Sequence, residues 1–363
     1  MPKFITFGEI MMRMAPPGFL RIQQALPGAL DVTFAGAEAN VAASLAVLGA
    51  DVGFVTALPH NTLGETCIHT LRGLGVDTSR VLKSEHGRLG IYFVETGANQ
   101  RPSRVIYDRA ASAISMTQPD AYDWRAILHG AHSLHVTGIT PALSHEAAAS
   151  TIAAVSSAHS LGVQVSCDLN YRAKLWNWRP ETDRKHLAAE IMNQVLPFVD
   201  ILIANEADCG DVLDIHAGGS NVESGNVDVA AYPDVARQVA HRFPNLKLIA
   251  TTLRESYSAS HNNWGAMLFD VAADKACFAP EVNGEYQPYE IKNIVDRVGG
   301  GDAFAAGLLF ALNHEDYSTA EQALKFATAA SCLAHSVHGD FNFSNRAEVD
   351  ALMQGSQSGR VVR

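Results

Sequence analysis

The chain has 363 residues, of which 47% are hydrophobic and 18% are charged, and its formal net charge is −11. A chain of this length and composition is expected to form a globular α/β protein with a sizeable core. The negative charge, together with the lack of any lysine and arginine cluster, argues against a nucleic-acid partner.

The cysteines and the first residues bear on where the protein works. The five cysteines are scattered and include no C-x-x-C pair, a pattern typical of reduced thiols in a cytoplasmic protein. The chain opens directly into the short apolar run Phe4–Ile10, with no basic region followed by a long apolar stretch. We therefore expect a cytoplasmic protein with no signal peptide and no membrane partner.

Apolar runs and helical segments alternate along the first part of the chain, as in a mostly parallel sheet flanked by helices. Ile5–Met12 is expected to be the first strand, although Gly8 and Glu9 interrupt it. The alanine-rich segment Ala35–Gly49 predicts a helix that stops at a glycine, and Val52–Leu58 predicts the next strand.

Two stretches fall outside this alternation. Residues 19–34 have the mixed composition of exposed strands and turns, and Leu89–Glu95 and Arg104–Arg109 predict the two strands of a hairpin. We expect these stretches to form a small β-sheet lid, contributed by about residues 13–34 and 88–112, over the end of the main sheet where such folds bind ligands.

Polar side chains follow the ends of two later strands. Val163–Asp168 is followed by Asn170 and Arg172, and Ile201–Ala204 is followed by Asn205-Glu206-Ala207-Asp208. Doubly wound sheets place their chemistry at this edge. A surface loop, or a helix cap in the second case, would explain the same residues.

The rest of the chain predicts further strands and helices within one domain that spans residues 1–363. We find no internal repeat and no domain linker. The expected features are strands Leu246–Leu253 and Trp264–Phe269, an insertion at Ser256–Asn263, an exposed loop at 216–231, helices near 303–312 and 320–338, and a loose tail at 355–363.

The segment Val295–Leu308, VDRVGGGDAFAAGL, predicts a glycine turn that opens a helix. Gly299, Gly300 and Gly301 can present several backbone N–H groups together, and with the positive end of the helix dipole they form an anion site. Asp302 follows at once and could take a proton from an attacking hydroxyl, so the segment offers both requirements of phosphoryl transfer. Taken alone, Asp302 could equally be a simple N-cap.

The motif D-x-V-G-G-G-D-A-F-A-A-G, which begins at Asp296, resembles the carboxyl-terminal signature of the ribokinase-like (PfkB) family of carbohydrate kinases. The resemblance implies that Asp302 is the catalytic base and that Gly299–Gly301 form the anion hole. Gly36 and Asn40 resemble the other signature of the family, in which the backbone and the asparagine hold sugar hydroxyls.

Within the family, the chain resembles kinases of 2-dehydro-3-deoxygluconate. The run Y-D-R-A-A-S-A is similar to their substrate lid, and the D-x-N-x-R pattern at Asp168 matches the family. Arginine suits a sugar acid because its planar fork meets a carboxylate through two hydrogen bonds. The resemblance implies that the acid sugar contacts Tyr92, Tyr107, Arg109 and Arg172.

The resemblance also implies ATP and Mg²⁺ as cofactors and leaves the use of a monovalent cation open. An aspartate stands where the family has the glutamate of its N-x-x-E motif, and an arginine stands where the family usually has a glycine turn over the nucleotide. The implied contacts are Asn170, Asn205, Thr252 and Arg254 for ATP, and Glu206 and Asp208 for Mg²⁺ through water.

The implied enzyme has a three-layer ribokinase-like fold and forms a homo-oligomer through its lid sheet. It uses ATP to phosphorylate the terminal hydroxyl of 2-dehydro-3-deoxy-D-gluconate, which gives the 6-phosphate. A family member acting on fructose, on ribose or on the galactonate epimer stays open as an alternative. A non-catalytic sugar-acid sensor is less favoured because Asp302 and all three glycines are retained.

Overall fold

The computed structural model describes residues 3–205, 207–217 and 228–355. Within this part of the chain, nine strands form the main sheet. Their spatial order is β14 (Lys275–Ala279), β13 (His261–Asp270), β12 (Leu248–Ser258), β11 (Ile201–Asn205), β10 (Gln164–Asp168), β9 (Ser133–Thr137), β1 (Lys3–Phe7) and β4 (Asp51–Val55), with β17 (Tyr289–Lys292) beside β13. The strands from β12 to β4 run parallel, and β13 pairs antiparallel with each of its neighbours.

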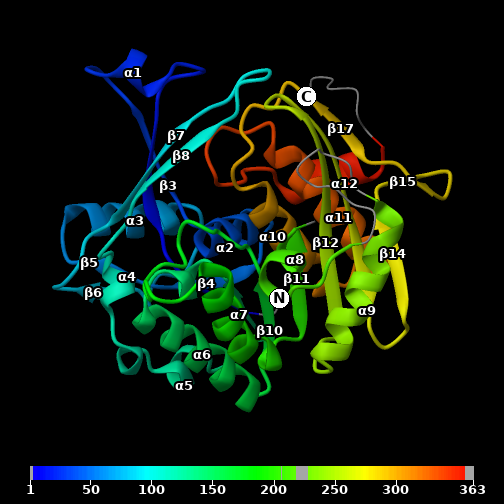
Figure 1. Ribbon diagram of the computed structural model, residues 1–363, viewed down its shortest axis with the longest axis horizontal. Helices are drawn as coiled ribbons and strands as arrows, with labels where there is room; N and C mark the ends of the chain where they lie inside the picture. Colours follow the sequence, from blue (N-terminus) through cyan, green and yellow to red (C-terminus); the bar gives the residue numbers. More distant parts are fainter. Residues whose placement is uncertain (1–2, 206, 218–227, 356–363) are drawn as a thin grey trace.

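Helices cover both faces of this sheet (Figure 1). Strand residues alternate between two cores, as Ile201 and Ile203 of β11 pack on one side and Leu202 packs on the other. The first core takes buried residues from α2 (Ala37–Val47), α3 (Thr62–Gly73), α10 (Gly300–Leu312), α11 (Ala320–Ala334) and α12 (Arg346–Met353). The second core takes them from α4 (Ala113–Met116), α5 (Trp124–Ile127), α6 (His145–Ser160), α7 (Arg184–Val195), α8 (Asp208–Leu213) and α9 (Tyr232–Arg242). The three-layer fold with a mostly parallel sheet is confirmed.

A separate small sheet has the order β3 (Asp31–Ala35), β2 (Met11–Ala15), β7 (Gly90–Glu95) and β8 (Arg104–Asp108). With the short helix α1 (Ile22–Ala25), it extends beyond the helical layers at the upper left of Figure 1. Its strands come from the two segments expected to form the lid. That this sheet closes over a bound ligand stays a prediction.

One strand prediction was wrong. The run Ile5–Met12 is divided between the two sheets, because the chain leaves β1 at Phe7 and enters β2 only at Met11. The expected strands Leu246–Leu253 and Trp264–Phe269 extend into the segment Ser256–Asn263, so that β12 and β13 form one long antiparallel hairpin.

The remaining elements are short. They are β5 (Ala57–Pro59) paired with β6 (Leu82–Ser84), β15 (Glu281–Val282) paired with β16 (Glu285–Tyr286), and the 3-10 turns at Pro119–Ala121, Thr140–Ala142, Leu196–Phe198 and Val229–Ala231. Most of the expected loop at 216–231 and of the expected tail lies outside the described residues. None of the described helices combines the length and apolarity needed to span a membrane.

Candidate active site

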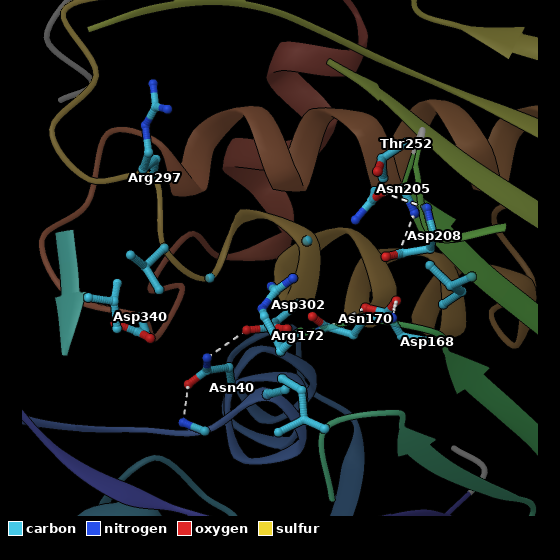
Figure 2. A pocket seen from close by; sticks show the side chains of 18 of the residues that line it. Asn40, Asp168, Asn170, Arg172, Asn205, Asp208, Thr252, Arg297, Asp302 and Asp340 are labelled. Atoms are coloured by element: carbon cyan, nitrogen blue, oxygen red, sulfur yellow. Dashed lines mark hydrogen bonds between the residues drawn. The ribbon is translucent and has the colours of Figure 1, made fainter. Parts of the chain in front are cut away.

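A cavity of about 350 Å³ lies at the carboxyl ends of β10 and β11 and extends to the small sheet (Figure 2). Parallel sheets bind ligands at this edge. Gly300 is not among the lining residues, and Glu206 lies outside the described residues. The other predicted site residues all line the cavity: Gly36, Asn40, Tyr92, Tyr107, Arg109, Asn170, Arg172, Asn205, Asp208, Thr252, Arg254, Gly299, Gly301 and Asp302.

The glycine turn opens α10 one turn earlier than expected, at Gly300 instead of Ala303. Gly299 is the N-cap, with a left-handed φ of 85°, and a Cβ on it would stand 2.3 Å from the carbonyl oxygen of Asp340. Gly301 faces the cavity, and nothing lies within 4 Å of an added Cβ there. Gly299 therefore shapes the turn, while Gly301 leaves room at a helix N-terminus, where backbone N–H groups and the dipole favour an anion.

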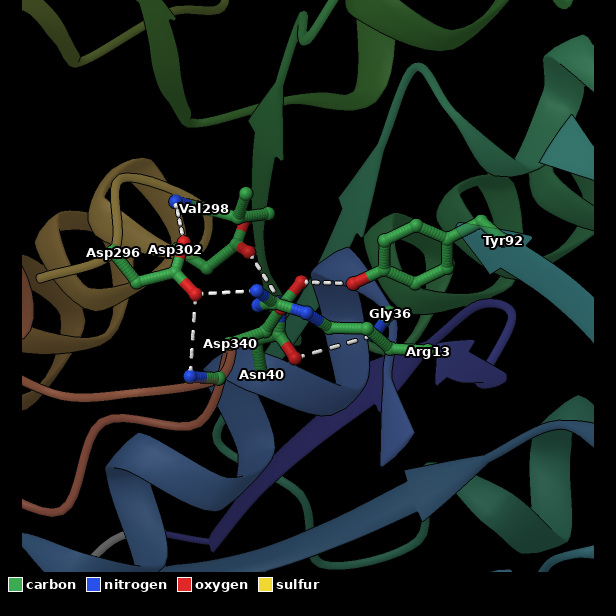
Figure 3. A network of polar contacts seen from close by, with 9 residues as sticks. Arg13, Gly36, Asn40, Tyr92, Asp296, Val298, Asp302 and Asp340 are labelled. Carbon is green, nitrogen blue, oxygen red and sulfur yellow. Dashed lines mark hydrogen bonds and ion pairs between the residues drawn. The ribbon is translucent and has the colours of Figure 1, made fainter. Parts of the chain in front are cut away.

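Asp302 lies inside the first turn of α10 and is not its cap, which excludes the N-cap interpretation. Its carboxylate is buried, and its Oδ2 accepts a hydrogen bond of 2.6 Å from Nδ2 of Asn40. The backbone N–H of Gly36 in turn donates to Oδ1 of Asn40 at 3.2 Å (Figure 3). Burial raises the pKa of Asp302 to about 6, and the Asn40 hydrogen bond opposes this rise. Such a group is ionised at neutral pH and can act as a general base.

Asp168 brings a second buried carboxylate to the same cavity. It ends β10 and accepts the backbone N–H of Asn170 at 3.1 Å. Burial raises the pKa of Asp168 well above its ordinary value, and the negative charges of Asp208 and Asp302 raise it further, while Arg172 opposes them. This part of the cavity therefore favours a positively charged guest.

Asp208 has both carboxylate oxygens engaged by the backbone. Oδ1 accepts the N–H of Tyr171 at 3.1 Å, and Oδ2 accepts the N–H of Asn205 at 2.9 Å. Asn205 returns the contact, because its Oδ1 accepts the N–H of Asp208 at 3.1 Å. Asn205 and Asp208 therefore bind each other reciprocally at the start of α8, whose N-cap is Ala207 and has no side-chain cap.

The two predicted substrate arginines line one cavity, Arg109 directly after β8 and Arg172 in the loop after β10. Arg172 is exposed, and its Nη1 donates to the carbonyl oxygen of Tyr171 at 3.2 Å. Arg109 is buried, pairs with Glu9, and holds its guanidinium carbon 5.4 Å from the ring centre of Tyr107. Glu9 thus already neutralises part of the charge that Arg109 could offer to a substrate.

The long hairpin forms the wall near Thr252 and Arg254, which lie two residues apart on β12 and both reach the cavity. Arg297, just before the glycine turn, supports the end of this hairpin. Its Nη2 donates to the carbonyl oxygens of Ser258 at 3.0 Å and Ala259 at 2.9 Å.

Sequence reasoning missed four charged residues beside the site: Glu9, Arg13, Asp296 and Asp340. Arg13 pairs with both Asp296 and Asp340, and the hydroxyl of Tyr92 donates to Asp340 at 2.7 Å (Figure 3). A signal was present, because Glu9 and Arg13 are charged residues inside an apolar run. Such residues are seldom buried without a partner.

The pfkB family carbohydrate kinases match the chain over residues 1–235 and 271–347, which is well over half of its length. The chain therefore belongs to the pfkB family of carbohydrate kinases and is an enzyme that phosphorylates sugars.

Several relatives have names that specify a substrate. A 2-dehydro-3-deoxygalactonokinase of Haloferax volcanii is 31% identical over 359 residues, which cover 98% of each chain. The crystal structure of a 2-dehydro-3-deoxygluconokinase from Thermotoga maritima is 43% identical, with a TM-score of 0.87, and the match covers 98% of this chain and 100% of that one. A PfkB family carbohydrate kinase from Listeria grayi is 31% identical, with a TM-score of 0.84 and coverage of 97% and 99%. The first two names specify a sugar-acid kinase, and the third gives the family alone.

Proposed function

We propose that this kinase uses ATP to phosphorylate the terminal hydroxyl of 2-dehydro-3-deoxy-D-gluconate, which yields the 6-phosphate and ADP. The observation that carries the proposal is the buried Asp302 carboxylate in the first turn of α10, directly after the glycine turn and open to the cavity. This arrangement supplies a base for the attacking hydroxyl beside a site for the transferred phosphoryl group.

Each residue of this centre has a role in the proposal. Asp302 takes the proton of the terminal hydroxyl as its oxygen attacks the γ-phosphorus. Asn40 holds the carboxylate in place through its 2.6 Å hydrogen bond. The backbone amides of Gly299–Gly301 stabilise the negative charge of the transferred group. Closure of the small sheet would exclude water and so protect ATP from hydrolysis.

The carboxylate arrangement fits Mg²⁺ that arrives with ATP. The charges of Asp208 and Asp302 are close enough to raise the pKa of Asp168, so a cation beside them is stabilised. Within the described residues no group of three acidic, histidine or cysteine ligands could hold a metal by itself. Mg²⁺ usually keeps several waters and binds through substrate phosphates with one or two carboxylates. We propose Asp168 and Asp208 as the outer-sphere contacts of Mg²⁺. The use of a monovalent cation is tested by comparing kinase activity in potassium and tetramethylammonium buffers.

The substrate class rests on two arginines and on the named relatives. Arg109 and Arg172 line one cavity, and a sugar acid offers a carboxylate that a neutral hexose lacks. The Thermotoga relative supports the gluconate substrate. The Haloferax relative makes the galactonate epimer the second candidate.

Analysis of the product tests the proposal. The protein would be incubated with ATP, Mg²⁺ and 2-dehydro-3-deoxy-D-gluconate, and the product examined by phosphorus and carbon NMR. We expect one ADP per sugar and a phosphate coupled to the carbon-6 protons. A phosphate on another carbon, or ADP release without a phosphorylated sugar, would contradict the proposed reaction.

We further propose that two copies associate through the outer face of the small sheet. Strand register places one set of apolar side chains together on the face opposite Arg13 and Tyr92. Val32 and Ile106 are 50% and 55% exposed, and an exposed apolar face of this kind is typical of an interface. The set comprises Met12, Met14, Val32, Phe34, Ile91, Phe93 and Ile106.

A cytoplasmic location also belongs to the proposal. All five cysteines are free thiols, and Cys67, Cys167 and Cys209 are buried. Free thiols are usual in a reducing compartment. Fractionation of the source cells would test the location.

A further inference from the structure

A buried arginine from the small sheet binds two carboxylates beside the glycine turn. Arg13 lies on β2, with 4% of its surface exposed, on the same face as Tyr92. Its Nη1 pairs with Asp340 and its Nη2 pairs with Asp296 (Figure 3). Arg13 does not line the cavity, so it does not reach a ligand there.

Asp296 connects Val298, the residue before the glycine turn, to the distant segment that contains Gly339. Its Oδ1 accepts the backbone N–H of Val298 at 3.1 Å, immediately before the N-cap Gly299. Its Oδ2, the atom that pairs with Arg13, also accepts the N–H of Gly339 at 3.3 Å. One carboxylate therefore fixes both Val298 and the segment that packs beside the turn.

Asp340 contacts the turn from the other side. Its carbonyl oxygen occupies the space where a side chain of Gly299 would stand. Its Oδ2 accepts the hydroxyl proton of Tyr92 at 2.7 Å, and its Oδ1 pairs with Arg13. The two segments that enclose Gly299 thus meet at a single guanidinium group.

The charges explain why an arginine is needed here. Asp296 and Asp340 are 4% and 7% exposed, so neither carboxylate has water to stabilise it. Two buried carboxylates repel each other, and a guanidinium fork can bind both at once in fixed geometry. Without Arg13 the pair would have to separate or take up a proton, and either change would move the backbone around Gly299.

We propose that Arg13 is a positioning residue of the kinase reaction, which holds the glycine turn in its anion-binding shape by bridging Asp296 and Asp340. The inference rests on the proposed role of the turn as the phosphate site. Because Arg13 belongs to β2, the small sheet is also tied to the catalytic turn through a buried contact. Tyr92 of β7 also donates to Asp340, so β2 and β7 are both attached at this point.

The test compares Arg13→Ala with Arg104→Ala, which removes an exposed arginine from β8 of the same sheet. We expect Arg13→Ala to lower kcat by about 100-fold, since a small misplacement of catalytic groups has effects of this size. KM for the sugar acid should change little, because Arg13 is outside the cavity. Guanidinium chloride at non-denaturing concentration should restore part of kcat in Arg13→Ala, and Arg104→Ala should behave as wild type.

Two results would overturn the inference: Arg13→Ala with kcat close to wild type, or a loss of kcat that guanidinium does not recover. If Arg13→Ala fails to fold, Arg13→Lys keeps the charge without the fork. We expect it to fold and to lose about tenfold in kcat, and wild-type kcat in this variant would refute the positioning role.

Calorimetric binding of a non-hydrolysable ATP analogue separates this inference from the identity of the sugar. Arg13→Ala should bind the analogue more weakly than wild type and Arg104→Ala, even if wild type phosphorylates a different sugar. Equal binding by all three proteins would contradict the role of Arg13 while leaving the proposed reaction unaffected.

Discussion

The side-chain amide of Asn40 donates a 2.6 Å hydrogen bond to the carboxylate of Asp302, although 262 positions separate them in the sequence. The fold joins them because α2 and α10 each have a glycine as N-cap, Gly36 and Gly299, and pack against each other. The contact therefore joins Asn40, which is expected to hold sugar hydroxyls, to Asp302, which is expected to take the proton from one of them.

Replacing Asp302 by asparagine should remove turnover without removing substrate binding. The hydrogen bond from Asn40 can still be accepted by the amide oxygen, so the cavity keeps its shape. General base catalysis is worth about 10²–10⁴-fold, and we expect kcat of Asp302→Asn to fall by at least this factor. Steady-state kinetics and calorimetric sugar binding test this, and near wild-type kcat would refute the role of Asp302.

The same substitution should stabilise the protein at alkaline pH. The pKa of Asp302 is raised to about 6 when folded, against 3.8 for an ordinary aspartate, so its ionised form destabilises the fold above both values and has no effect below both. Asp302→Asn should therefore raise the free energy of unfolding at pH 8 by about 1–3 kcal/mol and leave it unchanged near pH 3. Urea denaturation at the two pH values measures this; a variant less stable than wild type at pH 8 would contradict it.

The glycines of the turn should respond differently to alanine. At Gly301 an added methyl group meets no protein atom but faces the cavity, so Gly301→Ala should fold normally and bind ATP poorly. At Gly299 the methyl would collide with the carbonyl of Asp340 in a left-handed backbone, so Gly299→Ala should lose about 1–3 kcal/mol of stability. Melting temperatures and ATP affinity of the two variants distinguish the roles. Equal loss of stability in both would show that neither glycine is kept for a ligand.

The main sheet could be predicted from the sequence because strand alternation is a local pattern, and the polar strand ends indicated the edge of the sheet where the cavity lies. Most of the residues that line the cavity were predicted from the resemblance to the family. The division of Ile5–Met12 between two sheets could not be predicted, because both halves are apolar. Only pairing with β4 or with β7 decides which sheet each half joins. The β12–β13 hairpin was missed for a related reason: Ser256–Asn263 is polar, and its strand structure comes from pairing with β17 and from Arg297.

The network around Arg13 was also beyond local prediction. Asp340 is 327 positions from Arg13, and no spacing rule connects them. The resemblance of the chain to the family gave Asp340 no role. Only the three-dimensional fold shows that the two carboxylates need one shared positive charge.

Arg172→Ala separates two roles for this side chain. If Arg172 grips the sugar carboxylate, its loss should chiefly raise KM for the sugar acid and leave any neutral sugar unaffected. The charge of Arg172 also opposes the rise in the pKa of Asp302 and Asp168, so this side chain lies near the phosphoryl-transfer centre. If Arg172 contacts the phosphates of ATP, its loss should instead raise KM for ATP. Arg109→Ala should raise KM for the acid and also lower kcat through the lid. Unchanged kinetic constants in both variants would show that neither arginine contributes to substrate binding.

Association through the small sheet predicts a dimer that one substitution separates. Ile106→Lys places a charge on the edge strand β8 of the apolar outer face and should give a monomer by light scattering. Leu161→Lys, on a surface residue of similar exposure far from this sheet, should not change the mass. A wild-type monomer at micromolar concentration would contradict the interface.

The most direct test of the account is the ratio of kcat/KM values of the wild-type enzyme for sugar acids and neutral sugars, measured by coupled ADP release. We predict that 2-dehydro-3-deoxy-D-gluconate gives the highest value, with its galactonate epimer next and with fructose and ribose far lower. A higher kcat/KM for fructose or ribose would contradict the sugar-acid assignment and would leave Arg109 and Arg172 without a role in substrate recognition.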